Sequence, residues 1–142
     1  MVPVYWDWVK SSRLCMLSTV GTGGTDCSPR GDDGPVVQLL DDKTLLMTDW
    51  RGNNRMDSLR NIVSDGRVAL LFLVPGSNNV VRVNGTAIVS TSADLIGRFS
   101  DRGNLPRSVI VITVGEAYSQ CARALMRAAT WKAGDESQDL PS

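Results

Sequence analysis

Short runs of apolar and β-branched residues recur along most of the chain, separated by turns rich in glycine or acidic residues. Some runs are almost continuously apolar and others alternate between apolar and polar positions. Such runs favour strands, and the turn residues between them favour hairpins. The segments predicted as strands are 14–20, 25–30, 36–40, 44–49, 66–75, 78–91 and 108–118.

Elsewhere the apolar residues recur at the helical period of 3.6. The segments predicted as helices are 4–11, 54–64, 92–100 and 120–129. The pattern is clearest in the second of these, where four apolar residues fall on one helical face: Met56, Leu59, Ile62 and Val63. Asn53 or Asn54 is placed to cap its N-terminus.

The predicted strands mostly follow one another at short spacing, with helices inserted between a few of them. This order disfavours a Rossmann sheet and favours a mainly β fold, an antiparallel β-barrel with a few helices. The length of 142 residues fits one domain with a hydrophobic core. We expect this domain to span residues 1–132, with residues 133–142 as a polar C-terminal tail.

The charges of the chain balance, with fifteen basic and fifteen acidic residues. No global field would gather nucleic acid or an anionic membrane surface, so we expect neither as a partner. The apolar runs are far shorter than the roughly 20 residues that a membrane span needs, and the N-terminal segment does not resemble a signal peptide. A cytoplasmic protein is therefore expected.

The chain contains three cysteines and no histidine. An odd number of widely spaced cysteines predicts neither a disulfide framework nor a zinc site, so we expect reduced thiols in or near the core and no metal. Without histidine, catalysis by Ser-His-Asp or Cys-His groups is excluded. We assign no catalytic residue from the sequence.

The first candidate ligand site lies where a predicted strand ends and the clearest predicted helix begins. Its polar residues are Thr48, Arg51, Asn54, Arg55 and Ser58. A helix start favours an anion, and guanidinium groups offer the paired donors that phosphate oxygens accept. The alternative is a solvent-exposed, capped helix whose arginines pair with Asp49, Asp57 or Asp65.

A second candidate is Ser28-Pro29-Arg30, at the end of a predicted strand. Pro29 fixes the backbone before Arg30, and Gly31 permits a sharp exit, so the guanidinium is held at a sheet edge where it can meet a planar ligand. The alternative is an ordinary turn with an Arg-Asp ion pair.

A third candidate lies in the last predicted helix, where Arg123 and Arg127 are one turn apart and share a face. Two arginines on one face suit an anion or an acidic partner, and Trp131 follows them. The alternative is an exposed helix side, because long basic side chains commonly line such faces.

Several segments, in this order, resemble the pyridoxamine 5'-phosphate oxidase-related flavoproteins, the FMN-binding split-barrel family. The resemblance runs from Arg13 to Trp131. Its carriers are RLCMLSTV with TDCSPRGD, then TLLMTDWRGNNRMDSLRNI, GRVALLFLVPG, VVRVNGTAIV and PRSVIVITVGEAYSQCARALMR. It implies a split antiparallel β-barrel that forms a homodimer, with FMN in clefts between the subunits.

The resemblance also implies which residues contact the flavin. Ser28, Pro29 and Arg30 match the first flavin-contacting strand, while Met47 and Thr48 match the next, which faces the isoalloxazine and ribityl chain. The implied contacts of the phosphate are Arg51, Asn54, Arg55 and Ser58. The implied contacts with the partner subunit's flavin are Arg123, Arg127 and Trp131. Arg51 supplies a charge where the family has a second basic residue beside Arg55.

The resemblance implies an FMN-dependent oxidoreductase that acts on a small organic substrate. The lack of histidine agrees with this, because a flavin itself carries hydride and electron transfer. It also removes the Arg-x-His substrate motif of the vitamin oxidases, so we do not expect that activity. The alternative is a non-catalytic dimer that binds FMN or another planar ligand for storage, sensing or redox buffering, and a purely structural dimer is a third interpretation.

Overall fold

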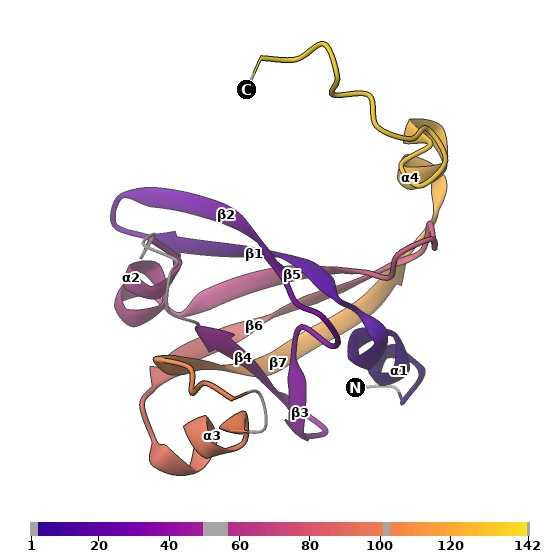
Figure 1. Cartoon of the computed structure of the whole chain (residues 1–142). Coiled ribbons are helices and arrows are strands. Elements are labelled where there is room, and N and C mark those ends of the chain that lie inside the picture. The colour runs from indigo at the N-terminus through magenta and orange to yellow at the C-terminus, as the bar shows by residue number, and fades with distance from the viewer. Residues whose placement is uncertain (1–2, 50–56, 101–102, 142) are drawn as a thin grey trace.

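The computed structural model describes residues 3–49, 57–100 and 103–141 (Figure 1). Each of its strands overlaps a predicted segment, and all pair antiparallel. They are β1 (Leu14–Gly21), β2 (Gly24–Gly31), β3 (Gln38–Asp41), β4 (Thr44–Asp49), β5 (Arg67–Leu73), β6 (Val80–Ser90) and β7 (Ser108–Gln120). The helices are α1 (Pro3–Ser11), α2 (Asp57–Ser64), α3 (Ala93–Gly97) and α4 (Arg123–Ala128). The predicted fold class, a mainly β antiparallel fold of the split-barrel type, is confirmed.

The strands of the described chain form one seven-stranded sheet in the order β2-β1-β5-β6-β7-β4-β3. Neighbouring strands in sequence form hairpins at β1-β2 and β3-β4, but β4 pairs with β7 rather than with β5. β4 and β5 are therefore not neighbours in the sheet, and α2 lies between them in the sequence. This helix packs on β1, β2 and β6, and Figure 1 shows it at one end of the strands.

The main core lies on the inner face of the coiled sheet. Strand residues alternate between faces, so Leu45 and Met47 of β4 point into this core while Leu46 points to the outer face. Trp6 and Val9 of α1 also pack into this core. On the outer face, a smaller cluster joins Leu46 to Val109 and Phe99, with residues of α3 packed against it; the members of both clusters are buried.

Helix α2 buries a narrower face than its sequence predicts. Ile62 is buried as expected and Leu59 is half-buried, but Val63 is 76% exposed. The prediction for Val63 was wrong because the buried residues of α2 are Ser58 and Ile62, one turn apart, and position 63 lies about 100° further round the helix. The apolar pattern predicts an apolar residue on the buried side of this helix, but the polar Ser58 lies there.

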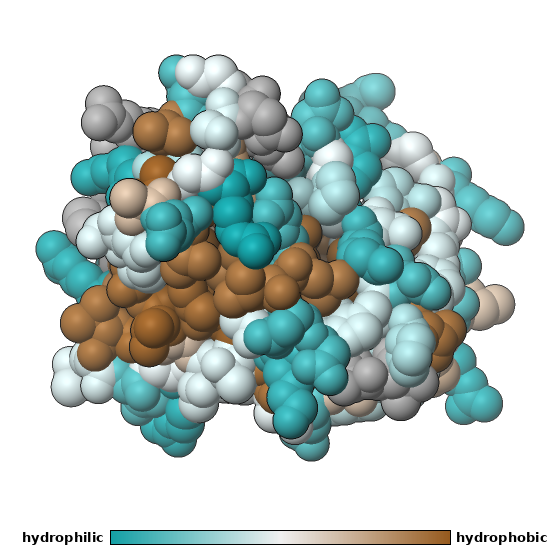
Figure 2. Space-filling view, turned by 90° about the horizontal axis from the view of Figure 1, so that it is seen from below, coloured by the Kyte–Doolittle hydropathy of each residue, from teal (hydrophilic) through white to brown (hydrophobic). Residues whose placement is uncertain are grey.

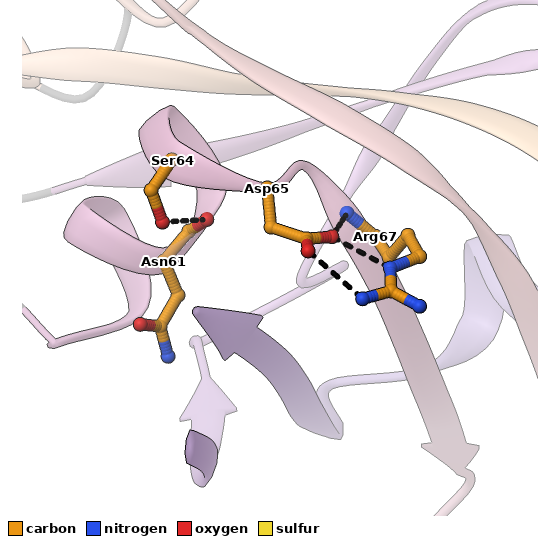
Figure 3. Close-up of polar contacts among 4 residues, drawn as sticks. All are labelled: Asn61, Ser64, Asp65 and Arg67. Carbon is orange, nitrogen blue, oxygen red and sulfur yellow. Dashed lines mark hydrogen bonds and ion pairs between the residues drawn. The ribbon is translucent and has the colours of Figure 1, made fainter. Parts of the chain in front are cut away.

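The C-terminal end of α2 is fixed by backbone hydrogen bonds and by the Asp65 carboxylate, which binds Arg67. Asp65 and Gly66 donate their N–H groups to the Asn61 carbonyl (2.8 and 3.4 Å), and the Gly66 carbonyl accepts from Ala87 N of β6 (2.7 Å). Figure 3 shows the Asp65 carboxylate receiving the backbone N–H, Nε and Nη2 of Arg67. Those side-chain and backbone donors lower the pKa of Asp65 to about 2.

All three cysteines are free. Only Cys15 is in the core, where burial raises the pKa of its thiol to about 12, partly opposed by the nearby charge of Arg30. Cys27 and Cys121 are exposed, so the expectation that they lie in or near the core was wrong. Within the ranges that the structure describes, no helix is long and apolar enough to span a membrane.

Candidate functional site

A pocket of about 240 Å³ lies between β2 and α2. Its lining residues are Asp26, Cys27, Ser28, Pro29, Arg30, Asp57 and Ser58. Alternate residues of β2 share a face, and Asp26, Ser28 and Arg30 are the half-buried set whereas Cys27 and Pro29 are exposed. Asp26 and Ser28 contact Ser58 of α2, and Arg30 contacts Ser28. Three polar side chains of one strand and a serine of one helix therefore meet in this pocket.

The four polar side chains form one chain of contacts. Ser58 Oγ donates to Asp26 Oδ2 (3.1 Å) and lies 3.4 Å from Ser28 Oγ. Arg30 Nε in turn donates to Ser28 Oγ (3.4 Å). A guanidinium therefore stands at one end of the contacts, a carboxylate at the other, and two hydroxyls between them.

The position of α2 over β2 depends on a close contact with β1. Asn61 Nδ2 donates to Thr19 Oγ1 (3.0 Å), and a Cβ at Gly21 would lie only 2.2 Å from Asn61 Oδ1. Glycine at position 21 thus lets the helix approach the end of the β1-β2 hairpin. Because Ser58 precedes Asn61 by three residues on the same helix side, this approach brings the Ser58 hydroxyl to β2.

Arg30 forms no ion pair within the described part of the chain. The alternative for this turn was an Arg-Asp ion pair. Such a pair is present, but its arginine is Arg13, whose Nη2 lies 3.2 Å from Asp33 Oδ1. A guanidinium carries five N–H donors, and Nε of Arg30 is the one engaged by Ser28. The remaining donors are suited to an anion such as a phosphate group.

The two predicted contacts on β4 lie away from this pocket. The Met47 side chain is buried in the main core, which leaves its backbone as the predicted contact. Thr48 is half-buried and, by strand alternation, shares the outer face with Leu46. The predicted phosphate contacts Arg51, Asn54 and Arg55 lie outside the described residues.

The C-terminal candidates also lie away from the pocket. Arg123 and Arg127 are exposed on α4, which Figure 1 places at the opposite side of the molecule from α2. Trp131 Nε1 donates to the Ser77 carbonyl (2.7 Å), which ties the segment after α4 to the β5-β6 turn. Within one chain these residues and Arg30 do not form a common site.

Sequence reasoning missed Asp26. Its signal was the alternation of polar residues at positions 26, 28 and 30, which places all three side chains on one face of a strand. Reading Ser28, Pro29 and Arg30 as a consecutive motif hid this pattern, because Pro29 and Arg30 point to opposite faces. No group of histidine, cysteine or acidic residues in the described ranges could hold a metal ion.

A larger hollow of about 460 Å³ opens on the other side of α2. Apolar side chains of Leu59, Val63 and Val89 line it together with exposed Arg60 and Arg107. At its base the buried Ser108 donates Oγ to Oδ2 of the buried Asp49 (3.2 Å). This pair joins β4 to β7 beneath the helix.

Comparison with solved structures gives the same fold at low sequence identity. The HupZ protein of Group A Streptococcus is 22% identical, covering 84% of this chain and 94% of that chain, with a TM-score of 0.67. A putative pyridoxamine 5'-phosphate oxidase from Lactobacillus delbrueckii is 22% identical, with coverages of 83% and 93% and a TM-score of 0.65. An FMN-binding protein from Syntrophomonas wolfei is 14% identical, with coverages of 83% and 81% and a TM-score of 0.57.

A search of curated proteins gives no match. The family model described as pyridoxamine 5'-phosphate oxidase, in contrast, matches residues 1–121. That range includes every strand of the sheet and both sides of the pocket between β2 and α2. The chain therefore belongs to the pyridoxamine 5'-phosphate oxidase family.

Proposed function

We propose that this protein binds FMN and is an oxidoreductase acting on a small organic substrate. The observation that carries the proposal is the pocket in which the Arg30 guanidinium and the Ser28 and Ser58 hydroxyls converge. Family membership and the fold shared with an FMN-binding protein support FMN as the cofactor.

The pocket fits the phosphate end of FMN by its donors. Arg30 supplies charge-assisted hydrogen bonds, which are shorter and stronger than neutral ones. Ser28 and Ser58 are held by β2 and α2, two elements that the Asn61–Thr19 bond keeps together, so little side-chain freedom is lost on binding. Arg51, Asn54 and Arg55 remain predicted contacts of the same phosphate.

The size of the pocket supports a homodimer. Sites that enclose small ligands measure roughly 300 to 1,000 Å³, whereas this pocket measures about 240 Å³. It can take a phosphate and part of the ribityl chain, and the isoalloxazine must lie outside it. A second copy of the chain would cover the ring, with Arg123, Arg127 and Trp131 of the partner's α4 region as its contacts.

Exposed apolar surface supports the same assembly. Ile88 of β6 is 64% exposed and pairs across the sheet with half-buried Val111 of β7, on the outer face. Figure 2, which views the molecule from below, shows apolar residues gathered in a continuous band between polar ones. Large contiguous apolar surface on a small protein marks an interaction site, and we propose a second copy as its occupant.

When bound, FMN supplies hydride and electron transfer. The residues of this chain would hold the phosphate at β2 and α2 and leave the ring accessible to a substrate. The absence of histidine and of the Arg-x-His motif supports a substrate other than pyridoxamine 5'-phosphate. A cytoplasmic location stays a prediction.

The proposal is tested by the absorption spectrum of desalted protein after FMN is added and the excess removed, followed by turnover assays. We expect retained flavin that nicotinamide or deazaflavin donors reduce and that acceptors reoxidise over many cycles. Retained flavin that no donor reduces would support the non-catalytic binding module instead. A protein that retains no FMN would contradict both.

A further inference from the structure

The direction of the hydrogen bonds in the pocket follows from the number of hydrogens available. A serine hydroxyl has one hydrogen, and that of Ser58 goes to Asp26, because a carboxylate can only accept (3.1 Å). In the contact between the two serines Ser58 is therefore the acceptor and Ser28 the donor (3.4 Å). Arg30 Nε donates to Ser28, so the bonds run from Arg30 through Ser28 and Ser58 to Asp26.

This direction has a consequence for an entering anion. Before an anion enters, both hydroxyl hydrogens point toward Asp26, so the serines can donate to a phosphate only if Asp26 receives another donor. A fully ionised phosphate could take the hydrogen of Ser58 only by depriving Asp26 of its donor, beside a carboxylate of the same charge. Ser58 is 3% exposed, so its hydroxyl has little water to donate to, and its hydrogen goes either to Asp26 or to the phosphate.

A phosphate monoanion avoids this conflict because it carries a hydrogen of its own. Its P–O–H group can donate to Asp26, which frees the Ser58 hydrogen to turn toward a phosphate oxygen, while Arg30 pairs with the remaining charge. We propose, on the basis of the proposed function, that Asp26 is a positioning residue that makes the pocket select the singly ionised phosphate of FMN. Phosphate binding is then coupled to a proton.

The proton balance is simple. A phosphate monoester loses its second proton near pH 6. Above that pH the free FMN is mostly a dianion, so each binding event takes up one proton from solvent and places it between the phosphate and Asp26. No covalent bond other than that O–H bond forms or breaks.

Few other charged groups face Asp26 in the described chain. On β2 the charged neighbour is Arg30, and the Cys27 thiol lies on the exposed face; on α2 the ionisable neighbour is Asp57. On β1 the residue opposite Asp26 is Thr19, which is neutral and bonded to Asn61. These side chains are all retained in a variant that replaces Asp26, so a difference in FMN binding between it and the wild type reports the loss of the Asp26 carboxylate.

The test is the pH dependence of FMN affinity, measured by quenching of flavin fluorescence between pH 5.5 and 8. For the wild type we expect affinity to fall with rising pH, approaching about tenfold per pH unit above roughly pH 6.5. In Asp26→Asn the fall should disappear, so that affinity is constant within about twofold or rises. Riboflavin, which lacks the phosphate, should bind independently of pH.

Asp57→Asn is the matched control, because it removes a negative charge from the same pocket without touching the Ser58–Asp26 bond. It should shift affinity while keeping the wild-type slope. The ³¹P resonance of FMN bound to the wild type gives a second readout that needs no variant. It should stay at the monoanion position at pH 7.5, where free FMN is mostly dianionic.

The outcomes are distinct. A wild type that binds FMN with a flat pH profile, or an Asp26→Asn slope equal to that of the wild type, overturns this inference and leaves FMN binding intact. A bound ³¹P signal at the dianion position overturns it as well. A wild type that binds no FMN at any pH removes both this inference and the proposed function.

Discussion

Replacing Gly66 tests whether the end of α2 is what holds that helix over the pocket. Gly66 has a φ of +89°, a left-handed conformation that side-chain-bearing residues rarely adopt. A Cβ at this position would also lie 3.2 Å from the Ala87 carbonyl oxygen. That atom belongs to the backbone of β6, paired with β5 and β7, so it cannot move away as a flexible side chain could.

The loss of stability expected for Gly66→Ala has two sources, the backbone conformation and the contact with β6. A residue held in an unfavourable backbone region costs about 1–3 kcal/mol, and the contact with Ala87 places Gly66→Ala toward the upper end. Gly76→Ala is the matched control, because its φ is +86° but nothing lies within 4 Å of the added Cβ. The difference between the two variants therefore isolates the contact.

Urea unfolding of the two variants and the wild type measures the effect as the free energy of unfolding at an unchanged m-value. We expect Gly66→Ala to be less stable than Gly76→Ala, and both less stable than the wild type. We also expect Gly66→Ala alone to weaken FMN binding, since α2 carries Ser58. Equal stability of the two glycine variants would refute the reasoning that β6 fixes the end of α2.

Three further changes probe separate parts of the fold. Donors of Arg67 lower the pKa of Asp65 to about 2, so its carboxylate stabilises the fold above about pH 4 and loses that contribution as the pH falls toward 2. In thermal melts, the melting temperature of Asp65→Asn should therefore fall less than that of the wild type between pH 4 and pH 2. Ser108→Ala should cost about 1–3 kcal/mol in denaturant unfolding, because the buried Asp49 loses its hydroxyl donor, and an unchanged midpoint would contradict it. Ile88→Asp should leave the monomer folded, because the side chain is 64% exposed, but weaken the proposed dimer in sedimentation equilibrium; an unaffected dimer would place the interface elsewhere.

The strands could be predicted because their signal is local. Alternation and turn residues are read within a few positions, and each predicted strand segment overlaps an observed one. The pairing of β4 with β7 was beyond reach, since it joins residues far apart in the chain. So was the irregular register at Gly85, where a Cβ would lie 2.1 Å from the Thr113 carbonyl oxygen of the neighbouring strand.

The candidate site was predicted in part for the same reason. Arg30, Ser28 and Ser58 were expected to bind a ligand, and the structure brings them together although they lie on different elements. Asp26 was missed because an acidic residue beside a turn is usually solvated, whereas the approach of α2 gives it the Ser58 hydroxyl as a donor. Val63 was assigned to the core by helical period alone, whereas the burial of α2 depends on which side meets β1 and β2.

The most direct test of the account compares FMN with riboflavin on the wild type and on Arg30→Ala. Charge-assisted hydrogen bonds contribute about 1.5–3 kcal/mol, so Arg30→Ala should weaken FMN binding about 10- to 150-fold and leave riboflavin binding unchanged. Arg13→Ala, which removes an exposed arginine paired with Asp33 outside the pocket, should bind both flavins as the wild type does. Undiminished FMN affinity in Arg30→Ala, or equal affinity of the wild type for FMN and riboflavin, would contradict a phosphate site between β2 and α2.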